Sequence, residues 1–277
     1  MNAPLSLVRF YGNPDYAIDC IETKKLTLPH ISKFNDPFDP ALDFITEFQG
    51  DYDLFLNWVQ INKSNSKAKE FKKILTRQVW KKTFNNLKSY AKTTKNSMFA
   101  ACFCESNINE AHPKDNLYMW GHYANGHRGI AIEFDTKVLI SKFGNKCVYK
   151  IEYVDELPRI TYEEGYKFFM FPDSIELQDL IRQKYDQIIR SKSKKWWKLE
   201  KEWRLMWTND ETILSYCKVP VEGLLPDNAI LAIYLGCELD PNIIPKITVQ
   251  AKKNHPNATI YKAEKVANTL ALKFIIL

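Results

Sequence analysis

Apolar positions gather in several short stretches of the chain that are bounded by polar and turn residues. SLVRFYG (6–12), SMFAACFC (97–104), RGIAIEFD (128–135) and CVYKIEYV (147–154) are rich in β-branched and aromatic residues and end at turn residues. AILAIYLG, KITVQA, ATIYKA and ALKFIIL show the same character after residue 228. The pattern therefore predicts a sheet of many short strands.

Two other regions space their apolar residues at helical intervals. Residues from about 51 to 95 predict a helical insertion. A further helix is expected from about 174 to 192, with Asp173 as its N-cap and Glu176 at the third helical position. Its buried stripe would be formed by Ile175, Leu180, Ile181, Tyr185, Ile188 and Ile189.

The order of these elements predicts an α+β fold. We expect a single domain over residues 1–277 with a mixed, mostly antiparallel sheet and a helical insertion at about 51–95. The chain contains no G-x-G-x-x-G or G-K-[ST] loop, which argues against a Rossmann or P-loop nucleotide site.

Composition narrows the class of protein. The sequence is 45% hydrophobic and 13% aromatic, and no apolar run is long enough to cross a membrane, so we expect a cytoplasmic protein without membrane association. Six scattered cysteines form no zinc pattern and are expected to be free thiols, and no metal site is expected. The net charge of +6 suits an anionic partner, although the basic stretches KSNSKAKEFKK and RSKSKKWWK could equally be solvated helix faces.

The run WKLEKEWRLMW (197–207) embeds charged residues in an apolar stretch. As one strand it would place Glu200, Glu202 and Arg204 on one face and Trp197, Leu199, Trp203, Leu205 and Trp207 on the other. The charged face is then either a wet sheet surface or the floor of a cleft.

Two further segments carry polar and aromatic groups. FNDPFD (34–39) contains Asn35 and Pro37 and predicts a rigid corner, with architecture and function equally open. NLYMWGHYANGHRGIAIEFD (116–135) is interpreted as an aromatic turn followed by a strand. Its aromatic, imidazole and guanidinium groups suit stacking and anion binding and belong to Tyr118, Trp120, His122, Tyr123, His127 and Arg128. His30, His112 and His255 are expected to make structural hydrogen bonds.

Together these segments resemble an uncharacterised bacterial family, domain of unknown function 2971. Its members share an N-terminal strand, an f-N-D-P-f-[DE] corner, a C-F strand leading to M-W-x-x-Y-a-x-x-h-x-G, and a late W-x-x-E-x-E-w-R. The matching positions here are Phe34–Asp39, Cys102 with Phe103, Met119–Gly129 and Trp197–Arg204.

The layout also resembles, more distantly, ADP-ribosyltransferase toxins, which bind NAD in the cleft of a split β-sheet. The resemblance implies an NAD-dependent effector, such as a toxin or phage-defence component, acting on protein or nucleic acid. It assigns catalysis to Glu202 and Glu200. The implied NAD-binding residues are Arg9, Asn35, Tyr118, Trp120, His122, Tyr123, Arg128 and Arg204.

The implied chemistry is breakage of the nicotinamide–ribose bond, which builds oxocarbenium-like charge that a carboxylate stabilises. It requires the glutamates, Arg9 and the aromatic turn to meet at one cleft. Two other classes of function stay open: a nucleic-acid-binding or nuclease-like module, and a non-catalytic sensor or structural partner.

Overall fold

The structure, a computed structural model, describes residues 3–36, 38–42, 46–48, 50–107, 110–145, 147–208 and 224–277. The chain divides into two compact units. The sheet unit comprises Met1–Pro29, Phe99–Ile151 and Leu199–Leu277, and the helical unit comprises His30–Met98 and Glu152–Lys198. Each unit is described by itself below.

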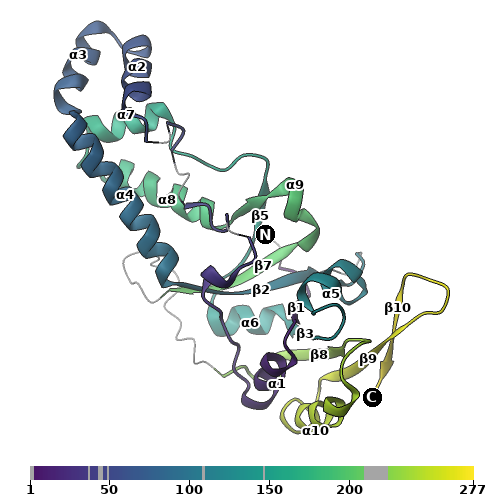
Figure 1. Ribbon diagram of the computed structural model, residues 1–277. Helices are drawn as coiled ribbons and strands as arrows, with labels where there is room; N and C mark the ends of the chain where they lie inside the picture. Colours follow the sequence, from purple (N-terminus) through teal and green to yellow (C-terminus); the bar gives the residue numbers. More distant parts are fainter. Residues whose placement is uncertain are drawn as a thin grey trace. The chain divides into compact units, whose positions relative to one another are not determined.

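The sheet unit is built on one eight-stranded sheet in the order β10-β9-β8-β3-β1-β2-β7-β4 (Figure 1). β8 and β9 are parallel, whereas β1 is antiparallel to both β2 and β3, and the pairs β3–β8, β4–β7 and β9–β10 are also antiparallel. The strands are β1 Ser6–Tyr11, β2 Met98–Ser106, β3 Ile130–Asp135, β4 Val148–Lys150, β7 Glu202–Thr208, β8 Ile230–Leu235, β9 Thr259–Lys265 and β10 Leu272–Ile276.

These pairings confirm the mixed, mostly antiparallel sheet of an α+β fold. The sheet of this unit continues across all eight strands, so the split expected from the transferase resemblance is not observed in it.

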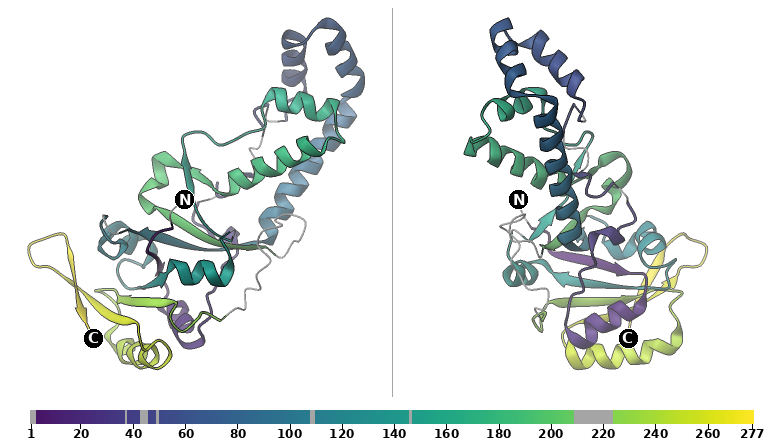
Figure 2. Two further views of the ribbon diagram at one scale, coloured as in Figure 1. Left: turned by 180° about the vertical axis from the view of Figure 1, so that it is seen from behind. Right: turned by 60° about the vertical axis from the view of Figure 1, so that its left-hand side comes forward.

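Strand alternation sends side chains to two different cores. On one face, Leu7, Ile132 and Leu205 pack in the main core with residues of α1 (Pro14–Thr23), α6 (Thr136–Phe143) and α10 (Ile244–Asn254). α1 and α10 lie side by side in both views (Figures 1 and 2). On the other face, Val8 belongs to a smaller cluster with Trp120 of α5 (Leu117–Tyr123).

The helical unit buries an aromatic core. Phe55, which is fully buried, contacts the rings of Phe48, Phe71, Trp80 and Phe169. The helices of this unit are α2 Tyr52–Asn62, α3 Asn65–Ile74, α4 Arg77–Ser97, α7 Tyr162–Met170, α8 Ile175–Ile189 and α9 Lys194–Trp197, and a parallel pair is formed by β5 Glu152–Val154 and β6 Ser191–Ser193. The predicted helices over 51–95 are confirmed, and the unit also takes in segments before and after them.

Two predicted features are wrong for local reasons. KITVQA forms part of helix α10 rather than a strand, because Pro245 suits the first turn and Ile247 and Ala251, four residues apart, both reach the core. Helix α8 is capped by Ser174 instead of Asp173; the Ser174 hydroxyl accepts a hydrogen bond from the Leu177 N–H at 3.4 Å.

The run 197–207 is not one strand. It passes from α9 through a short 3₁₀ turn, Lys198–Glu200, and Lys201 has a left-handed φ of 46° before β7 begins at Glu202. Trp203, Leu205 and Trp207 do pack on the main core, but Leu199 is 72% exposed. Glu200 therefore precedes the strand instead of sharing its face with Glu202.

Five of the six cysteines lie in the described residues. Cys20, Cys102, Cys104, Cys147 and Cys237 are not joined in disulfides, and Cys217 lies outside the described residues. No cluster of potential metal ligands occurs in the described part of the chain. Across the same residues, no helix has the length and apolar character needed to span a bilayer.

Candidate functional site

Helix α5 replaces the aromatic turn that the sequence predicted. The Asn116 side chain caps it by accepting hydrogen bonds from the N–H groups of Tyr118 and Met119 at 3.0 and 3.4 Å. Trp120 is fully buried, donates its indole N–H to the Lys114 carbonyl at 2.7 Å and meets the ring of Phe10 edge-on at 5.2 Å. Trp120 thus anchors α5 on the sheet, and its burial does not suit the predicted stacking role.

The end of α5 brings together three of the predicted residues. The rings of Tyr118 and His122 lie 4.4 Å apart on neighbouring turns, with His122 exposed and Tyr118 partly buried. The Tyr123 hydroxyl donates a hydrogen bond to Glu200. Glu200 is only 4% exposed, so this hydroxyl connects a buried carboxylate to the surface of α5.

Glu202 and Arg204 form a buried ion pair on β7. The guanidinium donates twice, from Nε to Oε1 at 2.6 Å and from Nη2 to Oε2 at 3.1 Å. The side chains are 4% and 1% exposed. Trp203 and Leu205, which alternate with Glu202 and Arg204 along β7, point into the main core. The ion pair therefore lies on the other face of the sheet, the face that α5 covers. Two parallel charge-assisted bonds fix both side chains.

Arg9 does not join this group. It shares a strand face with Leu7 and Tyr11, which both lie in the main core, so its side chain leaves β1 on the face opposite to Glu202 and Arg204. There it donates to the Thr27 carbonyl at 2.7 Å and lies over the Tyr11 ring. The expected convergence of Arg9 with the late glutamates on one cleft is not observed.

Arg128 lies at a different end of the strands. It lies two residues before the start of β3, where Ile130 pairs with Tyr11, whereas Glu105, next to the start of β7, pairs with Leu7. That separation is roughly 13 Å along the strand direction. The turn after Arg128 needs glycine, because a Cβ at Gly129 would lie 2.1 Å from the Tyr11 carbonyl oxygen.

Asn35 belongs to the helical unit, two residues after the 3₁₀ turn Ile31–Lys33. The neighbouring Asp36 side chain accepts a hydrogen bond from the Phe38 N–H at 2.9 Å, as expected of a corner built by Asx residues. Pro37 lies outside the described residues.

Sequence patterns do not single out Glu133, a further and largely buried carboxylate on the α5 face. Glu133 accepts hydrogen bonds from the hydroxyls of Ser6 and Tyr234, each at 2.5 Å, and from His112 Nε2 at 3.1 Å. Burial by itself would raise the pKa of Glu133, but these three donors outweigh it and lower the pKa to about 2. The sequence signal that could have indicated this cluster is a charged residue, Glu133, within the apolar strand segment between Ile132 and Phe134.

His112 makes the structural hydrogen bonds expected of it. Its Nδ1 accepts from the Lys114 N–H at 3.1 Å, so the proton of the neutral ring sits on Nε2 and points to Glu133. The other two residues behave in the same way: His30 contacts Ser32 and the Asn96 carbonyl, and His255 contacts the Ile21 carbonyl.

Comparison with known proteins supports one relationship. Residues 119–205, about a third of the chain, match a family described as "Protein of unknown function (DUF2971)". The match confirms the resemblance to this uncharacterised family. No curated protein and no solved structure matches the chain.

Proposed function

From a segment of an uncharacterised family and a partly buried Tyr123–Glu200 pair, we propose an NAD-consuming transferase that moves ADP-ribose to an acceptor, with Glu200 as its catalytic carboxylate. The observation that carries the proposal is the hydrogen bond from Tyr123 to Glu200, at the end of a helix that presents the rings of Tyr118 and His122. The distant resemblance to ADP-ribosyltransferase toxins supplies the reaction class.

Transfer of ADP-ribose demands one electrostatic feature above others. The bond between ribose C1′ and the nicotinamide nitrogen breaks with its electron pair going to nicotinamide, and positive charge develops on the sugar. A carboxylate held in place before the reaction stabilises this charge without further reorganisation. The acceptor then supplies the electron pair of the new bond to C1′ and gives its proton to a base.

Glu200 suits this role better than Glu202. Both oxygens of Glu202 already bind Arg204, so the pair holds the start of β7 in place. Glu200 lies in the 3₁₀ turn before the strand and is positioned by a tyrosine whose neighbours on α5 reach solvent. We therefore assign Glu202 and Arg204 a positioning role, with Tyr118 and His122 as the surface that holds the nicotinamide ring.

The proposal predicts release of nicotinamide from NAD by the purified protein, with water or an added acceptor taking the ADP-ribose. Glu200→Gln should lower the rate by about 100-fold or more, the size seen when one preorganised electrostatic group is lost. Glu264→Gln, at an exposed position on β9, is the matched control and should retain full activity. Absence of nicotinamide release by folded protein with protein, DNA and RNA acceptors would refute the transferase.

The biological role that goes with this chemistry is that of a cytoplasmic effector, a toxin or a phage-defence component. Consumption of NAD or modification of an essential acceptor arrests growth. Induced expression in a bacterial host should therefore stop growth with the wild-type chain and leave it unaffected with Glu200→Gln at equal protein level. Equal toxicity of both forms would contradict the role.

A further inference from the structure

Helix α4 of the helical unit carries a straight row of cations. Lys81, Lys88 and Lys92 are exposed, and Arg77 and Lys95 continue the row at its two ends. At 3.6 residues per turn, the five positions fall within about 60° of one another around the helix axis. The helix has 21 residues and is therefore about 30 Å long. We call Lys81, Lys88 and Lys92 the lysine row.

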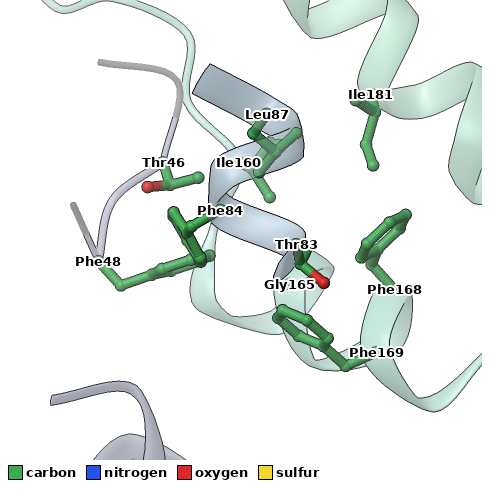
Figure 3. Close-up of a pocket in the computed structure, with 10 residues that line it drawn as sticks. All are labelled: Thr46, Phe48, Thr83, Phe84, Leu87, Ile160, Gly165, Phe168, Phe169 and Ile181. Carbon is green, nitrogen blue, oxygen red and sulfur yellow. The ribbon is translucent and has the colours of Figure 1, made fainter. Parts of the chain in front are cut away.

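The other flank of α4 is committed to the core. Trp80 is 5% exposed and Ala91 2%. Thr83, Phe84 and Leu87 line a small cavity together with residues of α7 and α8 (Figure 3). That cavity, of about 20 Å³, is apolar and no larger than a water molecule requires, so it is not a ligand site. Packing on this flank fixes α4 and leaves the lysine row outside the core.

Little negative charge surrounds the row along the chain. Glu70 is the one acidic residue in the sequence from 65 to 97, whereas α3 adds Lys67, Lys69, Lys72 and Lys73. Arg77 is neutralised by Asp53 at 2.7 and 2.8 Å. Among the described residues, none of the ion pairs involves a member of the lysine row. Its charges therefore face solvent without internal compensation.

We propose that the lysine row binds the phosphate backbone of double-stranded nucleic acid. The row advances by seven and then four residues, about 10 and 6 Å along a rigid helix. A fixed line of ammonium groups is complementary to the regular line of charges on a duplex strand. The inference is independent of the proposed transferase, since the binding needs neither NAD nor Glu200.

The surroundings favour a duplex over a single strand. Proteins that hold single strands stack bases on aromatic side chains. The aromatic residues of α4 are occupied elsewhere: the rings of Trp80 and Phe84 contact each other at a tilt with centroids 4.4 Å apart, and Tyr90 meets Tyr185 at 4.9 Å. The row has no aromatic member and supplies only charge, so sequence preference is not expected.

The test uses the full chain without NAD and a fluorescently labelled mixed-sequence 20-base-pair DNA duplex. Anisotropy titrations from 50 to 200 mM salt give the affinity and its salt dependence. The triple variant Lys81→Gln, Lys88→Gln, Lys92→Gln should bind about tenfold or more weakly at the lowest salt, and the slope of log K against log salt should fall by about 2.7 in magnitude. The triple arginine variant should bind like the wild type, because it keeps the charges.

The matched control changes three exposed lysines of the sheet unit, Lys137, Lys252 and Lys253, to glutamine. It removes the same charge and should retain the wild-type slope. Far-ultraviolet circular dichroism checks that each variant keeps its helices, which is expected because glutamine and lysine have similar helix propensities.

Four results would overturn the proposal. They are absence of duplex binding by the wild type at 50 mM salt, an unchanged slope in the row variant, an equal loss in the control, and tighter binding of single strands than of the duplex. Anionic lipid vesicles are a further probe, and row-dependent binding to vesicles in place of the duplex would assign the lysine row to a membrane surface and refute the nucleic-acid assignment.

Discussion

At the scale of single residues, buried charges are the features that most need explanation. Glu202 and Arg204 are almost completely removed from water, and each compensates the other through two hydrogen bonds. Breaking a buried pair leaves one uncompensated charge, which is more costly than removing both. Alternation along a strand shows that charged residues share a face, but it does not show whether that face is exposed to solvent or buried.

The Glu202–Arg204 pair gives the first prediction. Arg204→Met should lower the free energy of unfolding by about 3–5 kcal/mol, whereas the double variant with Glu202→Gln should be less destabilised because no buried charge is left alone. Urea unfolding of the three proteins measures both values. If the free energy of unfolding of the double variant were equal to or lower than that of Arg204→Met, the pair would not be isolated from water.

Glu133 gives a second prediction, in its dependence on pH. Its pKa is lowered from the usual 4.5 to about 2 in the folded chain, so the ionised form binds better in the native state. The resulting stability is fully present above the unfolded pKa and is lost as pH falls from about 4.5 to 2. The shift corresponds to about 3 kcal/mol. Glu133→Gln should therefore flatten the fall in unfolding free energy between pH 5 and pH 2.5.

Asp227→Asn is the control for this pH profile. Its carboxylate also has a lowered pKa, through Lys24, but it lies on the exposed surface. It should change the profile much less, because solvent weakens exposed pairs. An unaltered pH profile in Glu133→Gln would contradict the anchoring role of the cluster.

At the scale of elements, composition and period identified most strands and helices, and junctions caused the errors. The cluster of β-branched residues in KITVQA predicts a strand, yet residues of this segment reach the core at helical spacing. The alternation in residues 197–207 predicts one strand, but Lys201, with its left-handed φ, separates the run into two halves. The secondary-structure propensities of neighbouring residues do not reveal that one residue, such as Lys201, adopts a left-handed backbone conformation.

One experiment on the N-terminus of α8 distinguishes the cap predicted from the sequence, Asp173, from the cap in the structure, Ser174. Ser174→Ala should cost about 1 kcal/mol of unfolding free energy, since the Ser174 hydroxyl satisfies the Leu177 N–H. Asp173→Ala should be nearly neutral because it removes no hydrogen bond at the cap position. Thermal unfolding of the two variants measures the difference, and the reverse order would restore Asp173 as the cap.

At the scale of the whole molecule, the chain forms two compact units, each with its own core. The sheet unit packs aliphatic residues between the sheet and α1, α6 and α10, whereas the helical unit packs aromatic rings around Phe55. The family match, residues 119–205, draws on both units, because each contains segments from separate parts of the chain.

Separate cores predict separate responses to core mutations. Phe55→Ala removes a fully buried ring and should cost about 3–5 kcal/mol in the helical unit. Hydrogen exchange should accelerate in α2, α4 and α7, with smaller changes in β1, β3 and β8. Ile132→Ala, in the main core of the sheet unit, should give the opposite distribution. Uniform acceleration across both units in either variant would show one cooperative core instead.

The sequence by itself determined the α+β class, most strands and the helices over 51–95, because these depend on short-range period and residue type. It also singled out Tyr123, Glu200, Glu202 and Arg204 as chemically unusual positions. Only the tertiary structure decided which of these meet. Strand alternation and pairing order placed Arg9 on the opposite sheet face, buried Trp120 against β1, and joined Glu133 to three donors that lie far apart in the chain. The face to which a side chain points follows from pairing between distant segments, and no local pattern contains that information.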